Sequence, residues 1–265
     1  MLKHLYDTTN PDTESPANGF KVRDMLRFFA VDIILILSLR LLLDLGIFPS
    51  LNSYVLGILA SKMLLLGYLF WLIHCCRDAW PETGVSRFGR WWAWPVAVFM
   101  YAGFYPILVH VTRLNHSLME KLYAWFGWVY TPEPQDVMVL IFEDILANPI
   151  RLTLVVFAAL VGPFMEELAF RGLGLDAFKR SRGLLWALFW TSLLFGMYHF
   201  TLSLLLPLSL LGLLFGIVRA LSGGLWCAVF IHVLHNCLAL LIMAHEVGAI
   251  TTFKDEWQRL STLFG

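Results

Sequence analysis

Two adjacent glutamates and an arginine lie at the end of a long apolar stretch. Glu166 and Glu167 follow the uncharged run LTLVVFAALVGPFM, and Arg171 comes four residues after Glu167. A charge at the bilayer centre costs a few kcal/mol or more, so such groups persist where they face a protein interior or a wet cavity and have partners. On a helix, Glu167 and Arg171 lie on one face and can pair, whereas Glu166 points about 100° away. The pattern therefore predicts one neutralised carboxylate and one that is available for chemistry.

Two further apolar runs carry polar residues that membrane helices rarely keep. His199 lies in the run FGMYHF, and the run HVLHN places His232 and Asn236 four residues apart on one helical face. If two helices form a hairpin that turns near residues 181–183, Glu166 and His199 lie at matching depth, about 22–26 Å from the tip. His232 would reach a similar level on a third helix. We therefore expect three helices to present these side chains at one site.

This set of side chains could hydrolyse a peptide bond in two ways. A carboxylate near a histidine can take a proton from water, and a His–Asn face can donate hydrogen bonds to the oxyanion that forms. Alternatively, Glu166, His199 and His232 could bind a divalent ion such as zinc, which would then activate the water. The sequence contains neither HExxH nor GxSxG, which disfavours a helical zinc-hydrolase motif and a serine nucleophile.

The composition is that of a multi-pass membrane protein. Of 265 residues, 59% are hydrophobic and 14% are charged, whereas soluble domains have about 25% charged residues. The net charge is zero, so nothing indicates nucleic-acid binding. The four cysteines have no metal-type spacing, and we interpret them as packing residues. Apolar runs near the length that spans a bilayer occur at Met25–Phe48, Tyr54–Cys76, Trp91–Val111, Leu152–Leu173, Leu184–Phe200, Leu202–Leu221 and Leu225–Ala244.

The predicted fold is an all-α transmembrane bundle of about seven to eight spans with a cytoplasmic N-terminus. A polar tail covers residues 1–24, three helices cover 25–112, a four-helix catalytic core covers 151–245, and a tail covers 246–265. The region 113–150 alternates apolar and polar residues in a helical rhythm, which is typical of an interfacial amphipathic segment. With the N-terminus inside, the cytoplasmic segments hold eleven Lys and Arg residues against five outside, as the positive-inside rule requires.

Several other residues in the runs predict local contacts. Arg40 and Asp44 are four residues apart and should pair, and Asp32, nearer the inner end, should meet lipid head groups or water. His235 lies off the face of the catalytic histidine and is expected to make a helix–helix hydrogen bond. Gly212 and Gly216 have the GxxxG spacing that predicts close packing of two helices.

The three polar motifs resemble those of the CPBP family of intramembrane proteases. This family includes the CAAX prenyl endopeptidases and bacteriocin-processing or self-immunity proteins of the ABI type. The matching residues are Glu166-Glu167-x-x-x-Arg171, Phe195-x-x-x-His199 and His232-x-x-x-Asn236, in that order. Glu166 precedes His199 by 33 residues, and His199 precedes His232 by 33 residues. The resemblance covers about residues 150–245.

The resemblance implies a membrane endopeptidase whose site opens toward the cytoplasmic side. Carried over by motif, Glu166 would be the general base assisted by His199. His232 and Asn236 would stabilise the oxyanion. The other two motif residues, Glu167 and Arg171, would hold the first motif in place.

The family has been described both as metalloproteases and as metal-free glutamate proteases. We favour the glutamate type and expect no cofactor, with zinc on Glu166, His199 and His232 as the alternative. The expected partners are the lipid bilayer and a membrane-associated peptide or protein, cut as a CAAX-like end, a leader or a C-terminal sorting tail. The expected location is a bacterial cytoplasmic membrane.

A non-enzymatic role is the competing hypothesis. A transporter, or an immunity-type binding protein, could use a buried Glu–His network as a proton relay. Transporters usually show internal repeats, whereas the Glu and His motifs here are concentrated in one half of the chain. The distribution therefore favours the protease.

Overall fold

The computed structural model describes residues 19–76, 79–130, 145 and 148–246. Every regular element in this part of the chain is helical, which confirms the all-α prediction. The separate long helices are α2 (Val22–Asp44), α3 (Leu51–Cys75), α5 (Ala93–Trp125), α10 (Leu184–Tyr198), α11 (Leu205–Ser222) and α12 (Trp226–Glu246). The short elements are α4 (Ala79–Glu82) and η3 (Leu202–Leu204).

One long helical run contains two π-helical segments between its α-helical segments. Its segments are α7 (Pro149–Val156), η1 (Phe157–Val161), α8 (Gly162–Glu167), η2 (Leu168–Gly174) and α9 (Leu175–Arg182). Both η1 and η2 are π-helical, and such bulges are frequent at functional sites. The run ends at Gly183, whose φ of 87° is a left-handed conformation that suits glycine. The predicted hairpin turn is therefore confirmed.

All seven predicted apolar runs contain a helix. Five stretches are long and apolar enough to cross a bilayer: Leu51–Cys75, Ala93–Trp125, Pro149–Arg182, Leu202–Ser222 and Trp226–His245. Of the other two, α10 is a shorter apolar helix, and α2 carries several charged residues. The protein is a multi-pass membrane protein, while the number of its spans and the side of its N-terminus stay predictions.

The predicted boundary between the third helix and region 113–150 is corrected by α5. Instead of ending near Val111, α5 continues without a break to Trp125. Pro106 lies inside α5, and the helix continues through it. The second half of the predicted interfacial region, from residue 131, lies almost entirely outside the described residues.

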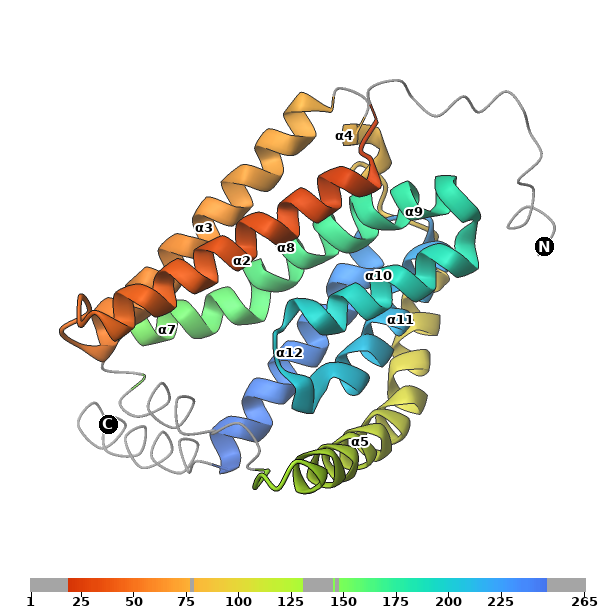
Figure 1. Ribbon diagram of the computed structural model, residues 1–265. Coiled ribbons are helices and arrows are strands. Elements are labelled where there is room, and N and C mark those ends of the chain that lie inside the picture. The colour runs from red at the N-terminus through yellow and green to blue at the C-terminus, as the bar shows by residue number, and fades with distance from the viewer. Residues whose placement is uncertain (1–18, 77–78, 131–144, 146–147, 247–265) are drawn as a thin grey trace, which may run out of the picture.

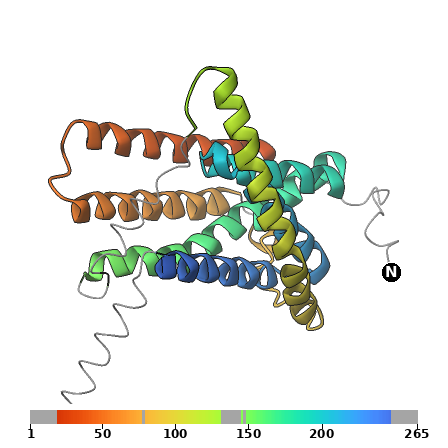
Figure 2. The same cartoon turned by 90° about the horizontal axis from the view of Figure 1, so that it is seen from below.

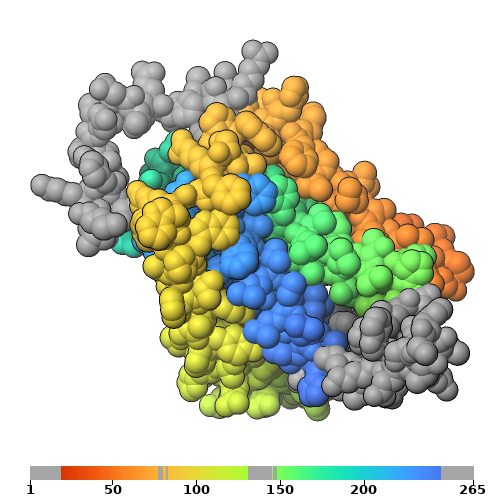
Figure 3. Space-filling model, turned by 180° about the vertical axis from the view of Figure 1, so that it is seen from behind, coloured from red at the N-terminus to blue at the C-terminus, as the bar shows by residue number. Residues whose placement is uncertain are grey.

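The helices form a bundle in which the site-bearing run lies between two groups. Figure 1 shows α2 and α3 beside the α7–α9 run, with α10, α11 and α12 on its other side. Viewed from below, α2, α3 and the α7–α8 segment lie as successive layers, and α5 crosses the opposite end (Figure 2). Figure 3 shows α5, α12 and α7–α8 side by side on the rear face.

Close packing of α10 against α11 follows from small residues. A side chain added at Gly216 would meet Leu188 of α10 at 2.7 Å, and one added at Gly212 would meet Phe195 at 3.1 Å. The same holds at Gly196, where an added carbon would lie 2.6 Å from the carbonyl oxygen of Leu205. The predicted GxxxG contact is confirmed, and it brings the end of α10 close to the helical run that carries the glutamates.

The charged residues of α2 lie in two kinds of environment, one exposed and one buried. Arg40 and Asp44 form the predicted pair, with 3.3 Å between their charged atoms at an exposed position. Asp32, by contrast, does not face solvent: its side chain is 2% exposed and accepts a hydrogen bond of 3.0 Å from Lys62 of α3. The prediction for Asp32 was wrong because its partner lies 30 residues away on a neighbouring helix.

Candidate active site

A fully buried ion pair fixes the first motif. Arg171 donates from Nη1 to Oε1 of Glu167 over 2.9 Å and from Nη2 to the carbonyl of Gly212 over 2.7 Å, and both charged side chains are 0% exposed. The guanidinium also lies 4.5 Å from the ring centre of Phe195 and 5.3 Å from that of Phe215. These contacts satisfy a charge that burial alone would disfavour. The predicted pairing of Glu167 with Arg171 is confirmed.

His232 of α12 joins the same buried pair. Its Nδ1 lies 2.9 Å from Oε1 of Glu167, the oxygen that Arg171 also contacts. A carboxylate held by a guanidinium only accepts hydrogen bonds, so the network assigns the Nδ1 proton to His232. The ring is further held by Phe215, which stacks on it with centroids 4.5 Å apart. His232 is thus fixed in position, with its Nε2 directed away from Glu167.

His199 is fixed in a similar way at the end of α10. Its Nδ1 lies 2.8 Å from the carbonyl oxygen of Phe195, so Nδ1–H is the donor and Nε2 is free to accept in the neutral ring. The chain turns immediately afterwards, because Phe200 has a φ of 52°. A left-handed conformation is costly for a bulky residue and is common at functional sites. His199 therefore stands at a sharp corner of the chain.

Both histidines converge on Glu166. Nε2 of His232 lies 3.7 Å from Oε2 of Glu166, and Nε2 of His199 lies 4.0 Å from the same oxygen. This oxygen is buried and has no hydrogen-bond partner among the described residues. The Glu166 side chain as a whole is 16% exposed, in contrast to the fully buried Glu167. The structure therefore contains the predicted neutralised carboxylate and, beside it, an available one.

Comparison with known proteins now connects this geometry with a family. Residues 148–238 match the family described as type II CAAX prenyl endopeptidase Rce1-like. This segment is similar to the proteins of that family. It contains all seven named residues of the three motifs, and the CPBP resemblance predicted from them is confirmed.

One curated relative supports the assignment. The chain is 26% identical over 107 residues to "Putative membrane peptidase YdiL" of Bacillus subtilis (strain 168). That match covers 40% of this chain and 43% of the relative. No solved structure matches the chain significantly.

Asn236 makes a structural hydrogen bond, and its predicted role at the oxyanion stays a prediction. Its Nδ2 donates to the carbonyl oxygen of Ala158 in η1 over 2.9 Å, and no described contact joins it to Glu166. In η1 the N–H of Gly162 bonds to the carbonyl of Phe157, five residues earlier. In that register the carbonyl of Ala158 would pair with residue 163, which is a proline without an N–H. Asn236 therefore supplies the donor that Pro163 lacks.

This contact predicts a stability effect at Asn236. Replacing Asn236 by Ala leaves a carbonyl unpaired at membrane depth, and we expect a loss of about 1–3 kcal/mol. Thermal unfolding of the purified variant in detergent measures it. Asn236→Asp serves as the matched control, because a carboxylate has the same size but cannot donate in its ionised form. If both variants unfold like the wild type, the hydrogen bond to Ala158 contributes nothing.

Two polar residues near these motifs were overlooked in the sequence-based prediction. Lys62 of α3 pairs with Asp32 and lies 5.3 Å from the ring centre of Tyr198. The Tyr198 hydroxyl is buried and interacts with the carboxylates of Asp32 and Glu166. A signal for Lys62 existed, since a lysine inside an apolar run indicates a buried partner. The signal for Tyr198 was its position beside His199.

His235 has the packing role predicted for it. Its Nδ1 lies 3.0 Å from the hydroxyl oxygen of Tyr101 on α5, and the two rings meet edge to face. This contact joins α12 to α5. His235 is thus a helix–helix hydrogen-bonding residue, separate from the group formed by Glu166, His199 and His232.

The donor types of the set fit a divalent ion. Glu166 presents an unpaired oxygen, and His199 and His232 present Nε2 lone pairs while their Nδ1–H groups bond to a carbonyl and a carboxylate. Ligating histidines have this outer-shell arrangement. Within the described residues, however, no three His, Cys, Asp or Glu side chains are gathered as closely as a metal site requires. The preference for a metal-free site therefore stays a prediction.

Proposed function

We propose that this protein is an intramembrane endopeptidase that hydrolyses a peptide bond in a membrane-associated peptide or protein. The observation that supports it best is the convergence of two histidine Nε2 atoms on one unpaired oxygen of Glu166. An unpaired carboxylate oxygen beside the Nε2 atom of His199 gives a water molecule two acceptors, one for each of its hydrogens. The Rce1-like family assignment gives the reaction class.

The first step is activation of that water. The water donates one hydrogen to Oε2 of Glu166 and the other to Nε2 of His199. Glu166 takes a proton as the water oxygen attacks the scissile carbonyl, and the same proton is later given to the leaving amine. Glu167 is less suited to this part, because its side chain is 0% exposed and its Oε1 is held by Arg171 and His232. A zinc ion on Glu166, His199 and His232, if bound, would supply polarisation of the water.

The second step needs donors for the oxyanion. His232 donates from Nε2 only when its ring is protonated, since its other nitrogen is committed to Glu167. Asn236 keeps a second Nδ2 hydrogen beside the one given to Ala158, so it stays a candidate. The buried hydroxyl of Tyr198, which interacts with Glu166, is an additional candidate donor.

Tyr198→Phe tests the additional donor. The change removes only the hydroxyl and keeps the ring that packs on Phe170 and His199. We expect kcat to fall about 10-fold or more with KM unchanged, because a donor to the transition state is lost. Tyr105→Phe, in α5, is the control. A KM increase with kcat unchanged would instead assign Tyr198 to substrate binding.

The substrate class follows from the family description. A CAAX-type substrate ends with a modified cysteine and three further residues, and we propose such a C-terminal segment as the preferred substrate. Leader peptides and C-terminal sorting tails are the other segments that a site at this depth would accept. A bacterial cytoplasmic membrane is the proposed location, in keeping with the Bacillus relative.

The test is a cleavage assay on purified full-length protein in detergent with a library of membrane-anchored peptides. We expect wild-type protein to cut at least one peptide and His199→Ala to be inactive. The assay is repeated with chelator and with elemental analysis of the protein. Activity that survives chelation in metal-free protein supports the glutamate mechanism, whereas activity lost on chelation and restored by zinc assigns Glu166, His199 and His232 as ligands. If no peptide is cut although the protein is folded, the protease proposal fails and the relay hypothesis gains support.

A further inference from the structure

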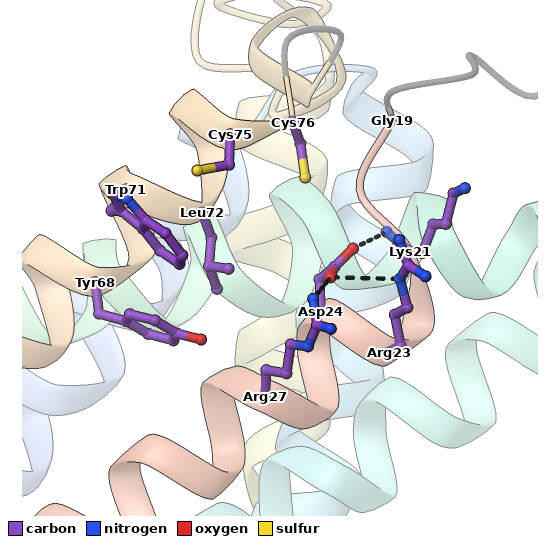
Figure 4. Close-up of a pocket in the computed structure, with 10 residues that line it drawn as sticks. All are labelled: Gly19, Lys21, Arg23, Asp24, Arg27, Tyr68, Trp71, Leu72, Cys75 and Cys76. Carbon is purple, nitrogen blue, oxygen red and sulfur yellow. Dashed lines mark hydrogen bonds and ion pairs between the residues drawn. The ribbon is translucent and has the colours of Figure 1, made fainter.

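A cavity of about 470 Å³ lies between the first turns of α2 and the last turns of α3. Figure 4 shows the side chains of Arg23 and Arg27 from α2, and of Lys21 just before it, on one side of the cavity. The opposite side is formed by Tyr68 and Trp71 of α3 with neighbouring residues (Figure 4). The cavity is separate from the catalytic set, none of whose members lines it.

The charged side of this cavity has an excess of positive charge. Three cationic side chains and one carboxylate, Asp24, line it, which leaves a net charge of two. Asp24 is buried and already has partners: it accepts from the backbone N–H of Lys21 and from Nη1 of Arg27, each over 3.0 Å, and Nε of Arg23 lies 3.8 Å from its Oδ1. The guanidinium groups of Arg23 and Arg27 keep further N–H donors, and their side chains are 67% and 61% exposed. Such forked donors suit the oxygens of a phosphate group.

Further cations surround this end of the bundle. α9 ends with Lys179, Arg180 and Arg182, and Arg180 donates to the backbone carbonyl of Phe20, next to Lys21. The last turn of α9 therefore lies beside the first turn of α2. A basic surface at one end of a membrane bundle attracts the anionic lipids of the cytoplasmic leaflet, at about 1 kcal/mol for each Lys or Arg.

The α3 side of the cavity is aromatic and apolar, which favours a lipid over a free anion as the ligand. Trp71 is exposed and stacks on Tyr68 with ring centres 5.5 Å apart, and Leu72 is buried beside them. Tryptophan and tyrosine with one wet and one apolar side are typical of the lipid head-group level. A ligand that fills the cavity would thus place an anion against α2 and an apolar body against α3.

We propose that this cavity binds the phosphate group of an anionic membrane lipid, with Lys21, Arg23 and Arg27 around the phosphate and Trp71 against the glycerol and upper acyl region. The site is independent of the proposed peptidase activity. Its occupant anchors the start of α2 to the membrane surface.

The test measures binding of short-chain lipids to full-length protein in a neutral detergent. The probes are dihexanoylphosphatidylglycerol, dihexanoylphosphatidylcholine with the same chains, and inorganic phosphate. We expect the phosphatidylglycerol to bind about tenfold or more tightly than the other two. The variant Lys21→Gln with Arg23→Gln should lose about tenfold or more of that affinity. Arg27 is left unchanged in this variant because it holds Asp24.

The matched control removes the same charge elsewhere. Arg113→Gln with Lys121→Gln in α5 changes two exposed cations far along the chain from the cavity, and it should keep wild-type affinity. Trp71→Leu should weaken phosphatidylglycerol binding and leave phosphate binding unchanged. The proposal is overturned if the two lipids bind equally, if the control loses as much as the site variant, or if phosphate alone binds as tightly as the anionic lipid.

Discussion

Glu166→Gln is expected to abolish peptide hydrolysis and to leave the fold intact. The amide has the size of the carboxylate but cannot take a proton from water, and loss of a general base alone costs about 10²–10⁴-fold in rate. Stability should change little, because Oε2 of Glu166 has no hydrogen-bond partner among the described residues. The measurements are kcat/KM on a peptide that the wild type cuts and the thermal unfolding midpoint in the same detergent.

Glu120→Gln is the matched control for this variant. Glu120 is an exposed glutamate of α5, so the same change there should alter neither rate nor stability. Retained cleavage in Glu166→Gln would exclude Glu166 as the base. Lost cleavage together with a fall in the unfolding midpoint would assign Glu166 a structural role in place of a chemical one.

The features that could be predicted from the sequence are those set by helical periodicity and chain length. The spacing of Glu167 and Arg171 defines one helix face, and the two residues do pair there. Similar numbers of residues on the two sides of the turn place Glu166 and His199 at one depth. Oε2 of Glu166 and Nε2 of His199 lie 4.0 Å apart. A helix has a fixed rise and twist, so these relations need no knowledge of neighbouring helices.

The features that could not be predicted depend on which helices meet. Asp32 and Lys62 are 30 residues apart on different helices, and their hydrogen bond exists only because α2 and α3 pack at one register. Asn236 looked like a catalytic donor because it shares a face with His232. Asn236 bonds to Ala158 because the π-helical turn before Pro163 leaves the carbonyl oxygen of Ala158 without a backbone donor. A register change of this kind leaves no periodic trace in the sequence.

Arg171→Met is expected to cause the largest loss of stability. The change leaves the fully buried Glu167 without its cation and removes the donor to the Gly212 carbonyl. Breaking a buried ion pair from one side costs about 3–5 kcal/mol. Thermal unfolding in detergent should therefore occur at least about 6 °C lower than in the wild type. Arg40→Met is the control, because its exposed pair with Asp44 should contribute less than about 1 kcal/mol.

Removing both charges separates the electrostatic cost from the loss of packing. The variant Glu167→Gln with Arg171→Met has no unpaired charge, and replacing a buried pair in this way is often neutral. We expect it to regain most of the lost stability yet to hydrolyse slowly, because His232 no longer has a carboxylate to hold its Nδ1 proton. If the double variant is as unstable as Arg171→Met, the contacts of Arg171 with Phe195 and Phe215 outweigh its charge. If it is stable and fully active, the ion pair has no part in positioning His232.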